Sequence, residues 1–459
     1  MRSIRLFSIV AASSILAAAS APVIAETAGA PPAAVGLDVG LARPLLLAGQ
    51  KNSAQLRVSL IGHRAPDGQI GNDGQSQNRP EVNVCIAIDR SGSMAGAKME
   101  NARRGALSAV AKLRDNDFVS VVAYDDVVRV VVPAARASNR AALQAGIDAL
   151  HPGSDTALFA GVVKCAAEVR KFASKNRVNR IVLLSDGMAN VGPSSPAELG
   201  TLGAELGAEG ISVATIGLGL DYNEDLMAEL AMRSDGGHVF VEQPADLARF
   251  LEQELGAIAA VVARDVEVKI RCAPGTHPLR VIGRHAEIVG QTVTTTFGKI
   301  YGQRQHLFVL ELETDPGATG SSRPLAAVEV TFHDLLAHRD FKLQRPIAVE
   351  FSARGAEVER RADPRIVSEV SLLNADLATD RAIKLRDQGN FAAAQEELRK
   401  NADALEQVHQ KYQDPRLQDR LREAKKRADS LSPKPAEWNA QRKSYRKSMQ
   451  DAPLDGLKL

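Results

Sequence analysis

The sequence is short of the residues that mark several large classes of protein. Aromatic side chains make up only 4% of its 459 residues, which argues against a surface that stacks nucleic-acid bases. Positive and negative side chains nearly balance at a formal net charge of +2, so no strong field marks a nucleic-acid binder. The sequence also lacks a Gly-x-Ser-x-Gly motif and a phosphate-binding Gly-x-x-x-x-Gly-Lys loop, so no hydrolase or nucleotide site is visible.

Cysteine is scarce as well, with only Cys85, Cys165 and Cys272 in the chain. Their spacing matches no Cys-x-x-Cys motif or other metal-binding pattern. An exported protein can form one disulfide from three cysteines and leave one thiol. Because Cys85 lies in an apolar strand-like run and Cys165 on the apolar side of an expected helix, we expect both to be buried and unpaired.

Long apolar runs are missing beyond the N-terminus. There, Arg2 and Arg5 precede an apolar stretch from Leu6 to Ala21, and Val23-Ile24-Ala25 offers the small residues of a cleavage site. This pattern predicts a signal peptide over residues 1–25, with an uncleaved N-terminal anchor as the alternative. The mature protein would then be periplasmic or secreted, without a transmembrane segment.

The chain is too long for a single core and divides by pattern into several regions. Residues 26–79 hold a linker and short β-like runs, and residues 80–262 alternate between strands and helices. Residues 263–355 show the alternation of a β-sandwich-like module, which the early strands of residues 26–79 would complete if the α/β region is an insertion. Residues 356–432 resemble a helical hairpin of the tetratricopeptide kind, and residues 433–459 read as a flexible basic tail. Within the helical region, we expect Lys425, Lys426 and Arg427 to form a solvated face, with an envelope-surface contact to anionic lipid or cell wall as the minor alternative.

The alternating region predicts an α/β fold. Val82–Ile88 is a nearly continuous apolar run, which is typical of a strand covered on both faces. Lys98–Leu113 has helical spacing, and two strand-like runs, Phe118–Tyr124 and Val127–Val132, form an expected antiparallel pair. We therefore predict a doubly wound, mainly parallel sheet with helices on both faces.

The chemistry is concentrated where the first of these strands ends. Asp89, Ser91 and Ser93 follow the apolar run directly, and Gly92 allows the sharp turn that lets their oxygens converge. Ligands of open α/β sheets bind beyond the carboxyl ends of the strands. Carboxylate and hydroxyl oxygens suit Mg²⁺, and no nearby Cys or His favours zinc.

The segment Asp89-x-Ser91-x-Ser93 looks like the metal-ion-dependent adhesion site of von Willebrand factor type A (VWA) domains of the bacterial secreted type. Two later segments match the rest of that site: Thr156 precedes an expected helix, and Asp186 ends a buried strand. The resemblance implies that Ser91, Ser93 and Thr156 touch a divalent ion, Mg²⁺ or else Mn²⁺ or Ca²⁺. Asp89 and Asp186 would act mainly through bound waters and hydroxyls.

The same resemblance implies a protein-binding module for adhesion or assembly in the bacterial cell envelope, and not an enzyme. The partner would offer an Asp or Glu carboxylate to the metal. Two alternatives stay open, namely a metal-dependent hydrolase and a structural scaffold with a vestigial metal site.

Each part of this pattern also has an ordinary structural explanation. Thr156 can cap a helix, and Asp186-Gly187 can form a plain turn. We expect Asp125 and Asp126 to form a solvated turn and Arg90 to lie on the surface, pointing away from the metal. The acidic cluster at residues 221–225 most simply caps a helix.

Overall fold

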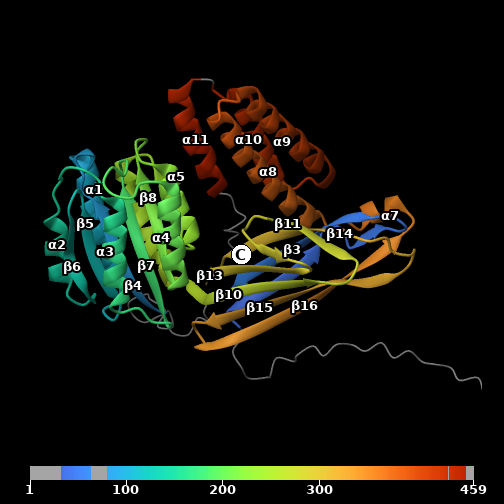
Figure 1. Cartoon of the computed structure of the whole chain (residues 1–459), viewed down its shortest axis with the longest axis horizontal. Coiled ribbons are helices and arrows are strands. Elements are labelled where there is room, and N and C mark those ends of the chain that lie inside the picture. The colour runs from blue at the N-terminus through green and yellow to red at the C-terminus, as the bar shows by residue number, and fades with distance from the viewer. Residues whose placement is uncertain (1–32, 64–79, 433, 451–459) are drawn as a thin grey trace, which may run out of the picture. The chain divides into compact units, whose positions relative to one another are not determined.

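The computed structural model describes residues 33–63, 80–432 and 434–450 (Figure 1). The expected signal peptide, residues 1–25, lies outside these ranges, and the tail after residue 450 does too. No helix in the described ranges is long and apolar enough to cross a membrane.

The predicted α/β fold is confirmed as a six-stranded sheet in which five strands run parallel and the edge strand β6 is antiparallel. In sheet order the strands are β6 (Val128–Arg136), β5 (Phe118–Tyr124), β4 (Glu81–Asp89), β7 (Arg177–Ser185), β8 (Ile211–Leu218) and β9 (His238–Val241). Because β4 lies centrally, alternate residues of its apolar run enter two different cores. Ile86 and Ile88 pack in one, while Cys85 and Ala87 pack in the other.

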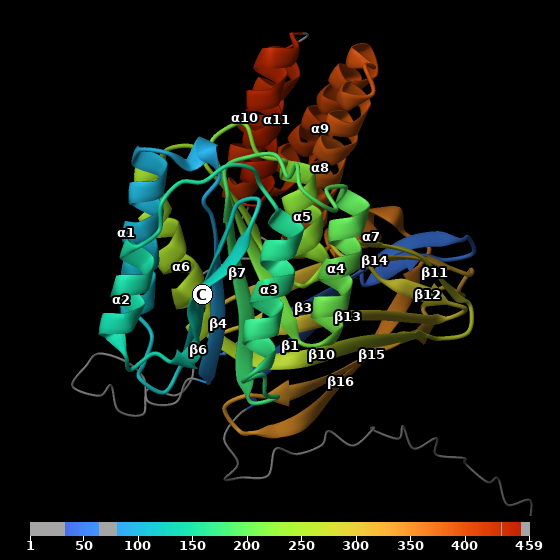
Figure 2. The same cartoon turned by 60° about the vertical axis from the view of Figure 1, so that its left-hand side comes forward.

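Helices cover both faces of this sheet (Figure 2). One face carries α1 (Ala97–Ala111), α2 (Arg140–Asp148) and α6 (Leu247–Ala259). The other carries α3 (Leu158–Arg170), α4 (Pro196–Ala208) and α5 (Glu224–Arg233). Two short 3-10 helices, η1 (Gly92–Met94) and η2 (Pro244–Asp246), lead into helices on the first face.

The two cysteines on the second face form a disulfide, so the expectation that they are unpaired was wrong. Cys85 points from β4 toward α3, and Cys165 lies on the side of α3 that packs on the sheet, with their Cα atoms 5.6 Å apart. Two buried thiols that face each other at this distance meet the geometry of a bridge. Cys272 is buried and free.

Two further sheets pack into a sandwich around a second core. One sheet contains β1 (Val35–Leu41), β3 (Asn52–Gly62), β14 (Gln305–Thr314) and β11 (Thr276–Ile282). The other contains β12 (Glu287–Val289), β13 (Thr292–Tyr301), β10 (Val261–Cys272), β15 (Ser322–Asp334), β16 (Arg339–Ser352) and β2 (Leu45–Leu47). All pairings are antiparallel except that of β2 with β16.

The pairing of β3 with β14 makes the α/β sheet an insertion between strands of the sandwich. One turn touches the chain on both sides of the insertion. The backbone N–H of Gly302 donates to the carbonyl of Ala260, 2.7 Å away, and that of Gln303 donates to the carbonyl of Gly62, 2.8 Å away. The two connections of the inserted segment are therefore neighbours in space.

The C-terminal region contains more helices than the expected hairpin. It consists of α7 (Gly355–Arg360), α8 (Pro364–Asp387), α9 (Phe391–Tyr412), α10 (Pro415–Ser430) and α11 (Pro435–Gln450). Helix α11 occupies a segment for which a flexible tail was expected. Its Trp438 and Tyr445 are buried against α8, α9 and α10, a contact that its basic composition conceals. Arg427 is buried too, so the expected solvated face of α10 is wrong at this position.

Candidate metal site

The candidate site lies at the carboxyl edge of the α/β sheet. Asp89 is the last residue of β4, and Asp186 directly follows β7, the neighbouring strand. Ser91 and Ser93 lie on the loop after β4, where buried Met94 anchors η1 to the core. Thr156 lies just before α3. The sheet order thus brings residues that are far apart in sequence to one edge.

Hydrogen bonds link four of the five expected ligands. The hydroxyl oxygens of Ser91 and Ser93 are 3.0 Å apart, and the Ser93 hydroxyl donates to Asp186 Oδ1 at 2.7 Å. The backbone N–H of Ser91 donates to Asp89 Oδ1 at 2.8 Å. These four side chains therefore form one connected cluster.

The hydroxyl of Thr156 approaches the cluster beside Gly187. A Cβ atom on Gly187 would lie 3.4 Å from the Ser93 hydroxyl and 3.6 Å from the Thr156 hydroxyl. Asn190 fixes this threonine, because its Oδ1 accepts the Thr156 N–H at 2.8 Å and its own N–H donates to the Thr156 carbonyl. The loop that begins at Asp186 therefore also positions Thr156.

Asp89 is a fully buried carboxylate whose charge has no cationic partner within the described ranges. Its Oδ2 accepts a hydrogen bond from Ser185 at 2.6 Å. Burial raises the pKa of Asp89 to about 6, and the nearby negative charge of Asp186 adds to this, although the bonds from Ser185 and Ser91 oppose it. A buried carboxylate with a raised pKa would be stabilised by a bound cation.

The donor set fits a hard divalent ion. It consists of hydroxyls and carboxylates, the oxygen ligands that Mg²⁺ and Ca²⁺ prefer. In the described part of the chain, no group of three or more His, Cys, Asp or Glu side chains is placed to hold a metal ion. Ser93 is exposed, so a ligand can reach the cluster from solvent.

Arg90 and Asp125 have a structural role that sequence reasoning missed. Asp125 is buried rather than part of a solvated turn, and Arg90 pairs with it at 2.6 Å instead of lying free on the surface. A Cβ atom on Gly153 would overlap the Asp125 carboxylate, so only glycine fits there. The Asp125 carbonyl accepts the N–H of Ala157 at 2.7 Å. Arg90 and Asp125 therefore tie the loop after β4 to the loop that carries Thr156.

Lys98 is a second residue that sequence reasoning missed. It is the second residue of α1, and its ammonium lies 2.5 Å from Asp186 Oδ2. Its only signal in the sequence is its place at the start of the helix after the Asp-x-Ser-x-Ser segment.

The acidic segment at residues 221–225 has partners outside this cluster. Asn223 caps α5 as expected, since its side chain accepts the N–H of Leu226 at 3.1 Å. The following Asp225 pairs with Arg442 of α11. His238 is buried between the hydroxyls of Thr215, 2.9 Å away, and Tyr222, 3.0 Å away. Burial lowers the pKa of His238 to about 4, so the ring is neutral at physiological pH.

The opposite, amino edge of the same sheet faces the sandwich and gathers cations. Arg180 of β7 pairs with Glu254 of α6 at 2.6 Å and donates to the Tyr301 hydroxyl at 2.8 Å. Lys299 of β13 donates to Ser212 Oγ at 2.5 Å and to the carbonyl of Asn179 at 3.2 Å. Burial lowers the pKa of Lys299 to about 7.

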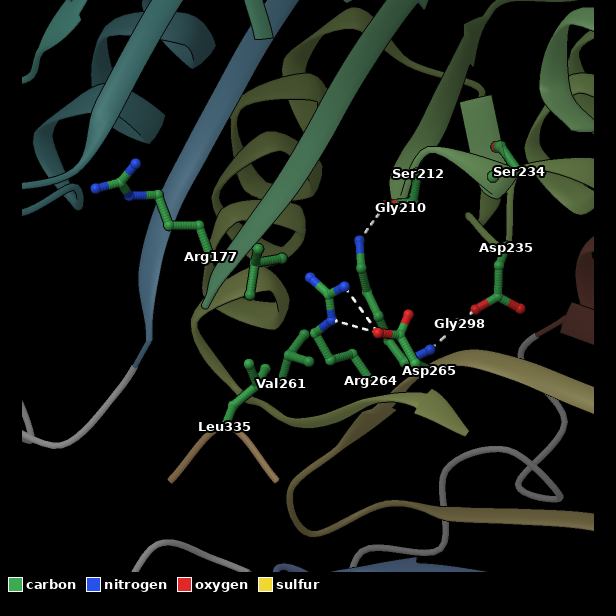
Figure 3. A pocket seen from close by; sticks show the side chains of 13 residues that line it. Arg177, Gly210, Ser212, Ser234, Asp235, Val261, Arg264, Asp265, Gly298 and Leu335 are labelled. Atoms are coloured by element: carbon green, nitrogen blue, oxygen red, sulfur yellow. Dashed lines mark hydrogen bonds and ion pairs between the residues drawn. The ribbon is translucent and has the colours of Figure 1, made fainter. Parts of the chain in front are cut away.

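A pocket opens at this edge, beside Ser212 of β8, Asp235 of the turn between α5 and β9, and Arg264 and Asp265 of β10 (Figure 3). Arg264 and Asp265 pair with each other at 2.7 Å, and Asp235 accepts the backbone N–H of Lys299 at 3.2 Å. Because these polar groups pair with one another, the pocket belongs to the contact between the α/β domain and the sandwich.

A sequence-family model for the von Willebrand factor type A domain matches residues 83–253, which include Asp89, Thr156 and Asp186. The chain contains a VWA domain. Such domains often mediate metal-dependent protein interactions.

Two curated relatives align with part of this chain. "Uncharacterized protein YfbK" of Escherichia coli K12 is 28% identical over 207 residues, which are 45% of this chain and 36% of that protein. "Uncharacterized protein sll0103" of a Synechocystis strain is 24% identical over 281 residues, which are 59% of this chain and 66% of that protein. The chain thus matches about a third of one relative and just under two thirds of the other.

A solved structure extends the likeness beyond the VWA domain. The von Willebrand factor type A protein from Catenulispora acidiphila superposes with a TM-score of 0.66 at 18% identity, over 85% of this chain and 91% of that one. At this identity the likeness shows the fold alone. The coverage includes the sandwich as well as the α/β sheet, since the VWA match is much shorter.

Proposed function

We propose that this protein is a divalent-metal-dependent protein-binding module of the bacterial cell envelope, serving adhesion or assembly. Its site would capture an Asp or Glu side chain of a partner protein. Mg²⁺ is the ion that the donor set favours, with Mn²⁺ or Ca²⁺ as the alternatives.

One observation carries the proposal: Asp89 is a fully buried carboxylate without a cationic partner among the described residues, beside the hydroxyls of Ser91 and Ser93. A buried charge of this kind is unfavourable unless an ion or a base compensates it. The oxygen-rich surroundings and the exposure of Ser93 favour an ion that is open to a second ligand.

The chain's own residues would divide the work. Ser91, Ser93 and Thr156 would hold the ion through neutral oxygens, while Asp89 and Asp186 would balance its charge from behind these hydroxyls. A bound ion supplies a Lewis-acid position that a carboxylate oxygen can occupy. Arg90 and Asp125 would keep the two loops in register.

An envelope location is supported by two independent features. The N-terminal residues match a signal peptide, and the Cys85–Cys165 disulfide suits an oxidising compartment. Exported proteins keep such bonds, whereas the reducing cytoplasm rarely does.

The test combines metal titration with partner capture. We expect calorimetry to detect Mg²⁺ or Mn²⁺ binding to the purified protein, and Asp89→Ala and Ser91→Ala to abolish it without unfolding. Ser154→Ala is the matched control, because this hydroxyl lies on the same edge but bonds to Asp126.

The same variants then serve in a pull-down from envelope extract. A partner captured by the wild type and by Ser154→Ala, and lost with chelator or with Ser91→Ala, supports the proposal. Capture that survives chelator contradicts it, and a wild type that binds neither ion favours a scaffold with a vestigial site.

A further inference from the structure

Lys98 is the one described cation that reaches a carboxylate of the candidate metal site. Arg90, which lies between Asp89 and Ser91 in the sequence, pairs with Asp125 at 2.6 Å and donates to the carbonyl of His151. Lys98 instead places its ammonium 2.5 Å from Oδ2 of Asp186, a side chain that is itself fully buried. The lysine comes from α1, an element that supplies none of the five expected ligands.

The position of Lys98 is unfavourable for α1 itself. Lysine is the second residue of this helix, where the backbone dipole carries partial positive charge and favours an acidic side chain. Its stem stays partly covered, with 27% of the side chain exposed. The pairing with Asp186 offsets this local cost, so the contact serves the site and not the helix.

The two oxygens of Asp186 have different partners. Oδ1 accepts the Ser93 hydroxyl at 2.7 Å, and Oδ2 receives the Lys98 ammonium. Each oxygen of Asp186 thus already carries one donor, so direct coordination of an ion would compete with Ser93 or with Lys98 for that oxygen. The lysine also leaves the site one negative charge short of what Asp89 and Asp186 would supply together.

We propose that Lys98 is a positioning residue that holds Asp186 out of direct contact with the metal and weakens metal binding. This inference rests on the proposed metal site. The ion then keeps neutral oxygens as its direct protein ligands and retains more of its positive charge. A carboxylate brought by a partner would therefore meet a more electrophilic ion.

The test replaces Lys98 with an uncharged residue of similar length. Removing one positive charge next to the site favours binding of a second cation, so we expect Lys98→Met to bind Mg²⁺ about tenfold more tightly by calorimetry. In chelator, the same variant should melt at a lower temperature than the wild type, because Asp186 has lost its counter-charge. The melting temperature gained on adding Mg²⁺ should therefore be larger in the variant.

A spectroscopic measurement separates positioning from charge alone. In electron paramagnetic resonance, ¹⁷O-labelled water broadens the spectrum of bound Mn²⁺, and the extent of this broadening gives the number of waters on the ion. We expect one water fewer in Lys98→Met, since the freed Asp186 oxygen replaces it. Lys98→Arg, which keeps the charge, should behave like the wild type. Lys112→Met removes an exposed lysine at the far end of the same helix and should change nothing.

The outcomes separate this inference from the proposed function. Equal Mg²⁺ affinity and equal water counts in wild type and Lys98→Met overturn the role of Lys98 while leaving the metal site intact. A wild type that binds no divalent ion overturns both. If Lys98→Met does not fold, Lys98→Gln gives the same comparison with a polar side chain.

Discussion

The two edges of the VWA sheet treat buried charge in opposite ways. At the carboxyl edge, Asp89 and Asp186 are buried anions, and only Asp186 has a cation beside it. At the amino edge, Arg180 is a buried cation that pairs with Glu254 of α6 and donates to Tyr301 of β13, so it links these two elements. In a doubly wound sheet, helix N-termini face the first edge and helix C-termini the second, which matches the sign of the charge at each.

This difference in pairing distinguishes a candidate ligand site from a structural contact between two domains. Charges that are paired within the chain hold parts together, whereas Asp89 has no such partner among the described residues and is left for a ligand. Removing the paired charge of Arg180 and removing the unpaired charge of Asp89 should therefore have opposite effects on the free energy of unfolding.

The largest expected effect is at the amino edge. Arg180→Met removes the cation of a buried ion pair and leaves the negative charge of Glu254 without a partner. This should lower the free energy of unfolding by about 3 to 5 kcal/mol. Arg177→Met at the start of the same strand breaks a partly exposed pair with Glu81 and should cost no more than about 1 kcal/mol. Denaturant titration of both variants measures the contrast, and equal losses would refute it.

The disulfide should matter mainly to the metal edge, because it joins β4, which ends in Asp89, to α3, which follows Thr156. Closing a span of 80 residues in the unfolded chain stabilises a protein by about 2 to 4 kcal/mol, so the variant Cys85→Ala/Cys165→Ala should lose that much. Cys272→Ala is the control for a lost buried thiol. Hydrogen exchange should accelerate around residues 153–157 and not at the start of β7; faster exchange at both places would show that the bond stabilises the whole domain.

At the metal edge, removing the unpaired charge of Asp89 should stabilise the metal-free protein. Asp89→Asn keeps an acceptor for the Ser91 N–H. Its amide N–H would donate to the Ser185 hydroxyl, which reverses the present bond, and the variant no longer buries an unpaired charge. The raised pKa of Asp89 implies a gain of about 3 kcal/mol at pH 7 in chelator. Thermal unfolding measures it, together with loss of the Mg²⁺-dependent shift. A less stable variant in chelator would mean that the charge is compensated in some other way.

The smallest effect is a pH dependence at the amino edge. Because the pKa of Lys299 is lowered to about 7 in the folded state, the unfolded chain binds this proton more tightly, and stability should rise with pH between about 7 and 10. The gain from this group is about 1 kcal/mol per pH unit. The charged groups that act on Lys299 are Arg180, Asp235, Arg264 and Asp265. Lys299→Met should lack the slope, so the difference from wild type in urea unfolding should grow with pH; a constant difference would contradict the assignment.

Much of the VWA fold could be predicted because its signals are local. The apolar run of β4 and the Asp-x-Ser-x-Ser segment behind it predict a strand, a turn and their place at the sheet edge. The Thr156 and Asp186 segments were recognisable because each stands at a junction between a strand or loop and a helix. That the five side chains hold a metal remains a prediction.

The contacts that could not be predicted depend on which elements become neighbours. Asp125 looks like a turn residue in sequence, and only the approach of Gly153 makes it a buried partner of Arg90. Cys85 and Cys165 lie 80 positions apart, and their pairing follows from the packing of α3 on β4. Helix α11 has the composition of a solvated tail. That it is an ordered helix follows from the packing of Trp438 against the other helices, which its sequence alone does not indicate.

The turn at Gly302 and Gln303 touches the chain where it leaves the sandwich and where it comes back. Because Gly62 and Ala260, which flank the inserted α/β domain, both contact this turn, the domain can be exchanged for another without interrupting a strand of the sandwich. The sandwich can thus stay the same while the inserted α/β domain varies. The candidate metal site lies at the carboxyl edge of the inserted sheet, opposite the amino edge that contacts the sandwich. We predict that grafting residues 81–259 between the corresponding strands of a relative would transfer the proposed partner binding and leave the sandwich unchanged.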